Sequence, residues 1–359
     1  MIYTINLFLS LLICFYNDLN KSRYSYSVSI GFCIFLWTCL IGGQYNVGTD
    51  YESYYWIFTN TDALELYYRK GEYLFYYIVY SLNYIGISGQ QIFIVIAFFY
   101  SVMLFKVLSY IDKRNTLLFI LLYITVSTVF HNQMNGIRQY MAVYLITLQM
   151  IFLLKKNYLI STLLLFASYF IHNSCLLFVF LIPVMLLMIY KVRSPKLIIL
   201  ILLVSSLVSL FSFEDKIKDL IYLSPEYRHY VESDYLSDMS LKGKITKLIF
   251  VPIYVYAILT VYKSNQLNEY ESKLFLLGIY SFIFRTLFLV TSVTNRLGYY
   301  FLILSIFPLF FLLRYLKVEQ RKRIFIIISY FFILQYLVKV LLFPVGEYSY
   351  DSYYIECLR

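Results

Sequence analysis

The sequence predicts an all-α polytopic membrane protein with about twelve transmembrane helices. Apolar residues make up 61% of the 359 residues and charged residues only 14%, a balance outside the range of soluble domains. Apolar stretches of spanning length recur along the whole chain, and Lys and Arg lie mostly in the short breaks between them. No hydrophilic domain interrupts this pattern, so we expect one integral membrane domain over residues 1–359.

The first apolar segment, residues 2–16, is expected to remain in the protein as a span. It lacks the basic start and the small-residue cleavage site of a secretory signal peptide. Basic breaks along the rest of the chain are expected to face the cytoplasm, because loops rich in Lys and Arg stay inside. These breaks are 21–23, 106–114, 155–156, 191–196, 263–273 and 314–323.

Alternation of the spans then places six segments on the extracytoplasmic side, together with both termini. They are 45–72, 131–138, 172–174, 214–243, 294–296 and the tail from 344. The largest, 214–243, contains the acids Glu214, Asp215, Asp219, Glu226, Glu232, Asp234 and Asp238. We expect this loop and the loop 45–72 to be external, with 214–243 acting as a lid or cap.

Residues 72–86 do not fit this alternation as a full span. The segment is apolar, but if it crossed the membrane, Lys106, Lys113 and Arg114 would lie outside. Apolar segments of this length are more often re-entrant or interfacial, so we expect such a helix on the outer side. The alternative adds one span and starts the chain inside, at the cost of placing Lys21 and Arg23 outside.

The net charge of +10 is accounted for by the cytoplasmic breaks and does not indicate nucleic-acid binding. The five cysteines are scattered, with no C-x-x-C motif and no histidine at ligand spacing, so neither a disulfide framework nor a metal site is predicted. The 41 tyrosines and 32 phenylalanines suit aromatic belts at the membrane interface, although their ring faces can also stack on sugars.

Ionisable groups at the ends of spans are costly in lipid and therefore mark candidate functional positions. Most of them fall on the expected outer face, and the list is Asp50, Glu72, Arg138 with Gln139, His172, Asn295 with Arg296, and Lys339. Arg285 is expected near the middle of its span. His131 and His229 are expected to be merely exposed.

Each of these residues also has a structural interpretation. Arg138 and Arg296 are at positions where arginines anchor spans to the interface. Arg285 would form a buried ion pair with Asp50 or Glu72 as readily as bind a phosphate. Asp50 is also typical of a turn or a helix N-cap, and His172 of a structural histidine.

Taken together, arginines with a histidine and a carboxylate at one membrane face indicate a site for a polyanionic ligand such as a lipid-linked pyrophosphate. The planar guanidinium donates two hydrogen bonds to oxyanions and stays charged when partly desolvated. The histidine would act as general base on a sugar hydroxyl while the arginines stabilise the pyrophosphate leaving group, and this chemistry needs no metal or other cofactor.

Several short motifs resemble the EpsG-like branch of the Wzy-type polysaccharide polymerases. They are Gly48-Thr49-Asp50-Tyr51 with Tyr54 and Phe58, Glu72 before an aromatic helix, Asn135-x-x-Arg138-Gln139-x-x-Ala142, Phe170-x-His172-x-Ser174, and Asn295-Arg296. They occur in the family's order over most of the chain. The sequence departs from the pattern where Tyr73 follows Glu72 and where Asn173-Ser174-Cys175 follows His172.

The resemblance implies a GT-C-like architecture and a polymerase of O-antigen, capsule or exopolysaccharide in the bacterial inner membrane. Such an enzyme transfers a growing glycan from undecaprenyl pyrophosphate to a second lipid-linked repeat unit at the extracytoplasmic face. His172 and Asp50 would be catalytic. The pyrophosphate-binding set would be Glu72, Arg138, Gln139, Asn295 and Arg296, to which we add Arg285 from its depth in the membrane.

Two related functions remain open from the sequence. An O-antigen ligase uses the same donor chemistry, and a flippase or other transporter also combines many spans with buried charges. Transporters usually show internal repeats, and none is visible here. The expected partners are the lipid bilayer and the lipid-linked donor and acceptor, beside a flippase and a chain-length regulator; nucleic acid is not expected.

Overall fold

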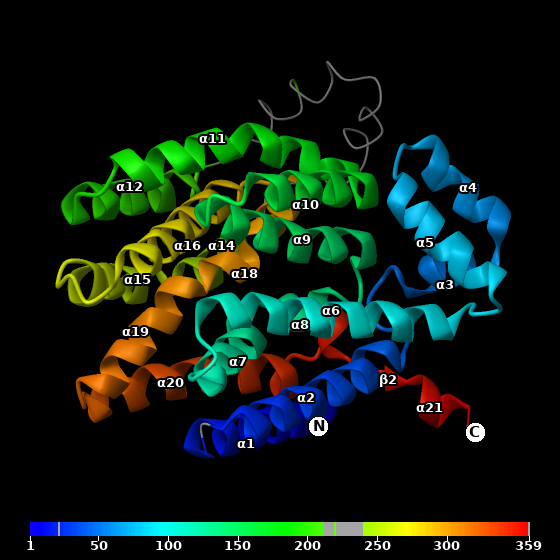
Figure 1. Ribbon diagram of the computed structural model, residues 1–359, viewed down its shortest axis with the longest axis horizontal. Coiled ribbons are helices and arrows are strands. Elements are labelled where there is room, and N and C mark those ends of the chain that lie inside the picture. Colours follow the sequence, from blue (N-terminus) through cyan, green and yellow to red (C-terminus); the bar gives the residue numbers. More distant parts are fainter. Residues whose placement is uncertain (21, 212–218, 220–239, 358–359) are drawn as a thin grey trace. The chain divides into compact units, whose positions relative to one another are not determined.

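The computed structural model is built almost entirely from helices (Figure 1). It describes residues 1–20, 22–211, 219 and 240–357. Most of the expected external loop 214–243, including His229, therefore lies outside the described residues. The described helices fall into two compact units, one formed by residues 1–176 with 316–359 and the other by residues 177–315.

The first unit contains the following elements in its N-terminal part: α1 (Ile2–Asn20), α2 (Arg23–Gly42), β1 (Gln44–Tyr45), α3 (Tyr51–Thr59), α4 (Thr61–Arg69), α5 (Tyr73–Tyr84), α6 (Gln90–Ile111), α7 (Thr116–Thr125), α8 (Val129–Asn132), α9 (Ile137–Leu154), α10 (Tyr158–Ile171) and η1 (Asn173–Cys175). Its core is built where α2 packs on α6, α6 on α9, and α9 on α10. Almost the whole length of α9 is buried.

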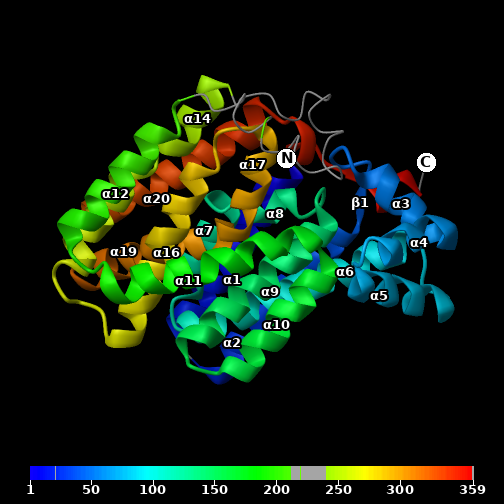
Figure 2. The ribbon, with the colours of Figure 1, turned by 90° about the horizontal axis from the view of Figure 1, so that it is seen from above.

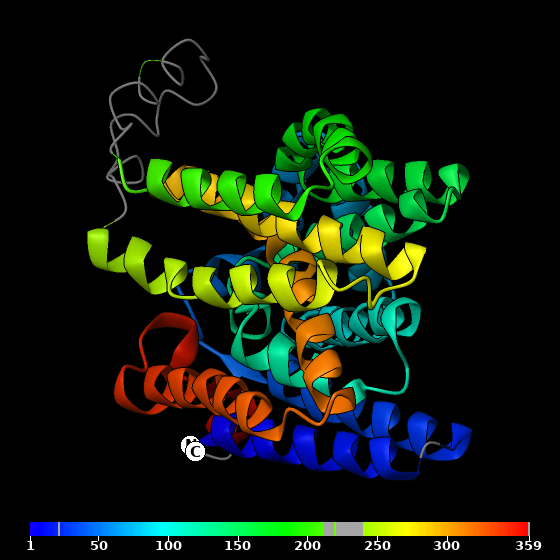
Figure 3. The same ribbon diagram turned by 90° about the vertical axis from the view of Figure 1, so that its left-hand side faces the viewer.

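The C-terminal elements return to this first unit, and they are α20 (Lys322–Leu337), η6 (Val338–Leu342), η7 (Gly346–Tyr348), β2 (Asp351–Ser352) and α21 (Tyr353–Glu356). β1 and β2 pair antiparallel, with Gln44 opposite Ser352. Both ends of α1 are tied to the segments that flank α20: Asp18 Oδ2 is 3.9 Å from Lys317 Nζ, and the Tyr3 hydroxyl donates to the Glu347 carbonyl at 2.9 Å. Figure 3 shows α1 and α20 on the same side of this unit.

The second unit contains α11 (Leu176–Lys191), α12 (Pro195–Val208), α14 (Leu241–Leu248), α15 (Val251–Ala257), η4 (Ile258–Tyr262), α16 (Glu269–Leu287), α17 (Ser292–Leu297), η5 (Gly298–Phe301), α18 (Leu302–Ser305) and most of α19 (Phe307–Val318). Its centre is α16, which packs against α12 and α18. A Cβ on Gly278 of α16 would lie 2.8 Å from the Leu304 carbonyl oxygen, so glycine permits the close approach of these two helices.

Eight described helical segments are long and apolar enough to cross a membrane, and three shorter apolar helices accompany them. The shorter ones are α7, α10 and α12. α16 has 19 residues but carries Glu269, Glu271, Lys273 and Arg285. Each expected span contains one of these eleven helices or α16. The chain is therefore an all-α membrane protein, while the number of twelve crossings stays a prediction.

The segment 72–86 forms one short helix, α5. Its 12 residues give a length of about 18 Å at 1.5 Å per residue, which is too short for a hydrocarbon core of about 30 Å. α5 packs against α3, α4 and α10, and Figure 2 shows α3, α4 and α5 grouped together beside one end of α6. α7 is shorter still, with 10 residues, so length alone does not decide which short helix crosses, and the re-entrant or interfacial placement of α5 stays a prediction.

Candidate functional site

Glu72 is the centre of a buried polar cluster in the first unit. The residue is only 3% exposed, and both carboxylate oxygens have partners. Arg138 Nη1 donates to Oε2, and His172 Nδ1 lies 2.9 Å from Oε1. The backbone N–H of Asn173 also donates to Oε1 at 3.3 Å. One carboxylate therefore holds a guanidinium and an imidazole on its two oxygens.

Three separate segments deliver these side chains. Glu72 precedes α5, in a tight turn whose Gly71 has a φ of +78°, a conformation that favours glycine. Arg138 is the second residue of α9, and His172 caps the C-terminal end of α10. The Asn173 side chain donates to the Lys70 carbonyl and thereby ties the end of α10 to the Glu72 turn.

Aromatic rings surround the guanidinium of Arg138. Its Nε donates to the Tyr54 hydroxyl at 3.4 Å, and its Cζ lies 4.3 Å from the centre of the Tyr67 ring, a cation–π geometry. The side chain keeps 18% of its surface exposed, and that of His172 keeps 22%. The buried carboxylate thus orients two side chains that each retain an accessible edge.

The charge state of Glu72 follows from these contacts. Burial raises the pKa of its carboxyl, but the hydrogen bond from His172 and the positive charge of Arg138 outweigh burial and bring the pKa below its ordinary value. An ionised carboxylate can only accept hydrogen bonds, so Nδ1 of His172 must carry a proton. In the neutral imidazole, Nε2 is then the nitrogen that can accept a proton.

The lowered pKa of Glu72 predicts a stability that depends on pH. The contribution is present above the carboxyl's unfolded pKa, near 4.3, and is lost as the pH falls through the lower folded value, because the unfolded state binds the proton first. In detergent, the melting temperature of the wild type should exceed that of Glu72→Gln at pH 7, and the difference should shrink as the pH falls below about 4. A difference that stays constant over this range would contradict the lowered pKa.

The Asp50 loop lies against the loop that precedes Arg138. The Asp50 backbone N–H donates to Asn135 Oδ1 at 2.8 Å. Gly48 has a φ of +77°, and a Cβ there would lie 2.6 Å from the same oxygen, so only glycine fits this close approach. Asp50 occupies the N-cap position of α3 but makes no capping hydrogen bond there with its side chain; its carboxylate accepts from Thr49 Oγ1 at 3.0 Å.

The second unit contains the remaining candidates. Asn295 and Arg296 lie on the short helix α17, where Asn295 Oδ1 accepts a hydrogen bond from Lys247 Nζ at 2.8 Å. Arg285 is in the last turn of α16, which ends at Leu287. A capping box, in which Thr291 and Thr294 bond each other's backbone, starts α17 inside the apolar run, so Arg285 lies near a helix end, and its depth in the membrane stays a prediction. A cation in a last helical turn is favoured by the helix dipole.

His131 is buried, contrary to the expected exposure. Its side chain is fully buried among aromatic neighbours. Nε2 lies 3.1 Å from the Tyr336 hydroxyl, and the imidazole stacks on the Tyr348 ring with 4.3 Å between the ring centres. Lys339 Nζ lies 3.9 Å from the centre of that same Tyr348 ring. Burial, with a smaller effect of the Lys339 charge, lowers the pKa of His131 to about 3. His131 is therefore neutral near pH 7 and packs as a member of this aromatic core.

Some residues of the cluster were not singled out from the sequence as site residues. Tyr67 carries no distinguishing signal among the 41 tyrosines, and Asn173 follows His172 without a motif of its own. Tyr54 and Asn135 appear in the motifs, but their contacts with Arg138 and Asp50 required the fold. Gln139, which was predicted as a site residue, lies next to Arg138 on α9.

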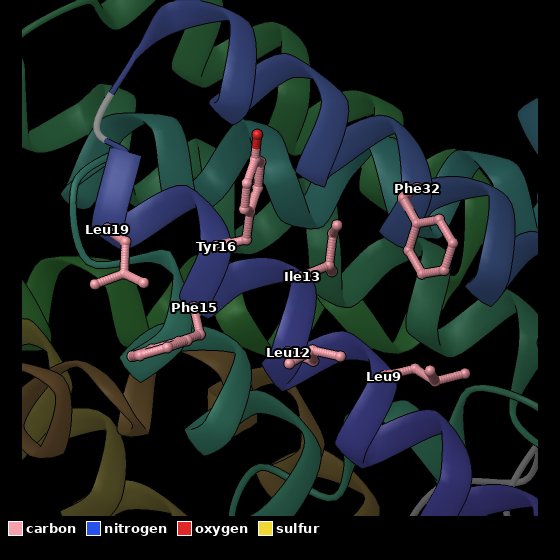
Figure 4. Close-up of a pocket in the computed structure, with 7 residues that line it drawn as sticks. All are labelled: Leu9, Leu12, Ile13, Phe15, Tyr16, Leu19 and Phe32. Carbon is pink, nitrogen blue, oxygen red and sulfur yellow. The ribbon is translucent and has the colours of Figure 1, made fainter.

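Two further features bear on what the protein can bind. Across residues 1–20, 22–211, 219 and 240–357, no group of three His, Cys, Asp or Glu side chains is placed to hold a metal ion. An apolar hollow of about 400 Å³ lies on the surface of α1 and α2 (Figure 4), with Leu9, Phe15 and Phe32 in its lining. Its lining contains no charged side chain, so the hollow suits hydrocarbon and not a pyrophosphate.

The fold and the cluster define a class: an α-helical membrane protein in which a buried carboxylate joins an arginine and a histidine. Residues 27–353 match the sequence model of the EpsG family. The match covers most of the 359 residues, so the chain belongs to the EpsG family, and the resemblance noted from the motifs is confirmed. Membership indicates a function of the polysaccharide polymerase type. No curated protein and no solved structure matches the chain.

Proposed function

We propose that this protein is a Wzy-type polysaccharide polymerase. It transfers a growing glycan from undecaprenyl pyrophosphate to the terminal sugar of a second lipid-linked repeat unit, at the extracytoplasmic face of a bacterial cell membrane. The observation that carries the proposal is Glu72, which binds Arg138 and His172 at once in a chain of the EpsG family. A general base and an oxyanion-binding group are thereby held side by side.

His172 acts as the general base. Its Nε2 takes the proton from the acceptor hydroxyl, whose oxygen forms the new bond to the anomeric carbon of the donor. The bond from that carbon to the pyrophosphate oxygen breaks, and its electron pair leaves with undecaprenyl pyrophosphate. Glu72 is a positioning residue, because its carboxylate fixes the proton on Nδ1 and stabilises the imidazolium that forms.

Arg138 binds the pyrophosphate. A guanidinium has five N–H donors; one N–H on Nη1 is directed to Glu72 and the one on Nε to Tyr54, so the remaining donors are available to phosphate oxygens. Negative charge that develops on the leaving group is then stabilised by hydrogen bonds whose direction is fixed in advance. The neighbouring Gln139 adds a neutral donor.

The second unit supplies further positive charge in this proposal. From the family resemblance we also assign Asn295 and Arg296 of this unit to anion binding, with Arg285 added from its expected depth in the membrane, and the reaction requires no metal because arginines compensate negative charge. Asp50 orients the acceptor sugar. Its backbone is fixed on Asn135, three residues before Arg138, so the acceptor and the leaving group are bound by connected loops.

The bilayer and the lipid-linked donor and acceptor are the immediate partners. A flippase that delivers repeat units and a regulator of chain length complete the proposed system. The expected topology, with about twelve spans and both termini outside, places Asp50, Glu72, Arg138 and His172 on the side where the glycan grows.

Deletion of the gene, followed by extraction and size separation of lipid-linked glycans, tests the function. Single repeat units should accumulate on the carrier at the outer face, and the ladder of longer chains should be lost. Complementation with the wild-type gene is the control. Long chains that remain on the carrier would instead identify a ligase, and repeat units trapped on the cytoplasmic side a flippase. An unchanged glycan profile would contradict all three.

A further inference from the structure

One face of α5 consists of tyrosines. Tyr73, Tyr76, Tyr77, Tyr80 and Tyr84 follow the spacing of helical neighbours, and we call this set the tyrosine stripe. Four of its members are between 42% and 83% exposed, whereas Phe75 and Val79 on the opposite face are fully buried. The stripe extends over about 16 Å at 1.5 Å per residue.

The rings of the stripe are held by contacts with one another. Tyr68 of α4 packs edge-on against Tyr73 at 5.1 Å and against Tyr76 at 5.2 Å between ring centres. Tyr76 in turn stacks on Tyr80 at 5.7 Å with an angle of 16° between the planes. Such mutual contacts restrict the rings, so less conformational entropy is lost when a ligand binds to them.

A carboxylate lies beside these rings. Glu65 of α4 lies near the Tyr76 hydroxyl, where burial and then the Glu65 charge raise the pKa of the phenol. The surface therefore combines aromatic faces, which attract the polarised C–H groups of a sugar ring, with hydroxyls and a carboxylate that bind its hydroxyl groups. An acidic group at this place also disfavours contact with the headgroups of anionic lipids.

The exposed faces of the long apolar helices have a different composition. α12 exposes Leu200 and Leu207, and α20 exposes Ile326 and Ile327, all more than half accessible. These aliphatic side chains suit lipid. α5 instead exposes tyrosines, whose hydroxyls favour an aqueous polar ligand over hydrocarbon.

The stripe is continuous with the Glu72 cluster. Tyr73, its first member, follows Glu72 directly in the chain, and the Tyr73 ring lies 5.8 Å from that of Phe170, two residues before His172. A ligand that runs along the stripe would therefore arrive at the imidazole edge of His172.

We infer that the tyrosine stripe, with Tyr68 and Glu65, binds an oligosaccharide chain and guides the end of that chain to His172. The inference rests on the proposed function for its ligand class. The glycan lies along α5 with sugar faces on the tyrosine rings, and its terminal hydroxyl reaches the base. The stripe binds and positions several sugars but takes no part in the bond exchange.

Replacement of Tyr77 and Tyr80 by leucine is the direct test. Leucine preserves an apolar surface but removes the ring faces; because it also removes the amphipathic ring of an interfacial anchor, the membrane level of the variant is measured beside its binding. The probe is the repeat-unit oligosaccharide released from its carrier lipid by mild acid, added to the purified full-length protein in detergent. Saturable binding to the wild type is expected, with a loss of at least tenfold in affinity in Tyr77→Leu/Tyr80→Leu.

Two matched variants accompany this test. Tyr77→Phe/Tyr80→Phe keeps the rings and should bind within about threefold of the wild type. Tyr158→Leu/Tyr330→Leu changes two tyrosines, each 62% exposed, on α10 and α20, and should bind like the wild type. Equal levels of each variant in the membrane and a single peak in size exclusion establish that the proteins are folded.

In a turnover assay, the leucine pair should raise the KM for the acceptor at least tenfold while kcat stays within about twofold, because the stripe contributes uniform binding. Binding equal to that of the wild type, or no binding by the wild type itself, would overturn the inference. These outcomes are separable from failure of the proposed function: loss of the polymer ladder on deletion together with unchanged binding rejects only the stripe. Binding that depends on the stripe without any change in glycans on deletion rejects only the polymerase.

Discussion

The Glu72→Gln variant is expected to lose polymer formation by at least about a hundredfold, the usual contribution of a general base. Glutamine has the size of glutamate but no charge, so it neither fixes the proton on His172 Nδ1 nor neutralises Arg138. The measurement is the size distribution of lipid-linked glycans in a deletion strain that carries the variant. Single repeat units should accumulate, as in the deletion itself.

The matched control is Glu271→Gln. Glu271 forms an ion pair with Arg314 at 2.6 Å and its side chain is 17% exposed, against 4% for Glu72, but it belongs to no motif. This variant should form polymer at near wild-type levels. A wild-type ladder from Glu72→Gln, with the protein present in the membrane, would remove Glu72 from the machinery.

A double variant separates positioning from mere structural support. If Glu72 acts through His172, then Glu72→Gln/His172→Ala should lose no more activity than the stronger single variant, because the two residues form one unit. Additive losses would instead indicate that the carboxylate contributes independently of the histidine.

Much of the fold follows from the sequence because lipid imposes a simple rule: backbone groups must be satisfied inside helices, so apolar runs of sufficient length become helices. This rule predicts the apolar helices between α1 and α20 and the short α5, but not α3 and α4, which lie in the segment 45–72 that was expected only as an external loop. It is weakest where an apolar run is broken by local hydrogen bonds. The run after Arg285 looks continuous in sequence, yet the side chains of Thr291 and Thr294 start a new helix within it.

The candidate site could be predicted in its members but not in its arrangement. Arg138, His172 and Glu72 were chosen because charges are costly in a membrane protein, and each choice considered the residue largely alone. That Glu72 binds the other two depends on packing of the α5 start against the ends of α9 and α10, which periodicity does not encode. The same limit explains His131: its short segment looks like an external loop, whereas returning C-terminal residues such as Tyr336 and Tyr348 bury it.

The Arg138→Lys variant is expected to abolish polymer, again by about a hundredfold or more, the loss typical of a removed oxyanion donor, although the positive charge is kept. The guanidinium donates to Glu72 through Nη1 and to Tyr54 through Nε while it lies over the Tyr67 ring. An ammonium group is a compact point charge without this planar fork, so a lysine that reaches Glu72 cannot also hold Tyr54 and present further donors to a pyrophosphate.

Arg314→Lys is the comparison that gives this result its meaning. Arg314 also pairs with a carboxylate, that of Glu271, and its side chain is 21% exposed against 18% for Arg138. Loss of polymer in Arg138→Lys alone would show that the requirement is for guanidinium geometry at this position and not for arginine ion pairs in general. The glycan ladder and the membrane level of each variant provide the measurement. A normal ladder from Arg138→Lys would mean that charge alone suffices and would remove the pyrophosphate-binding role of Arg138, leaving it as a counterion of Glu72.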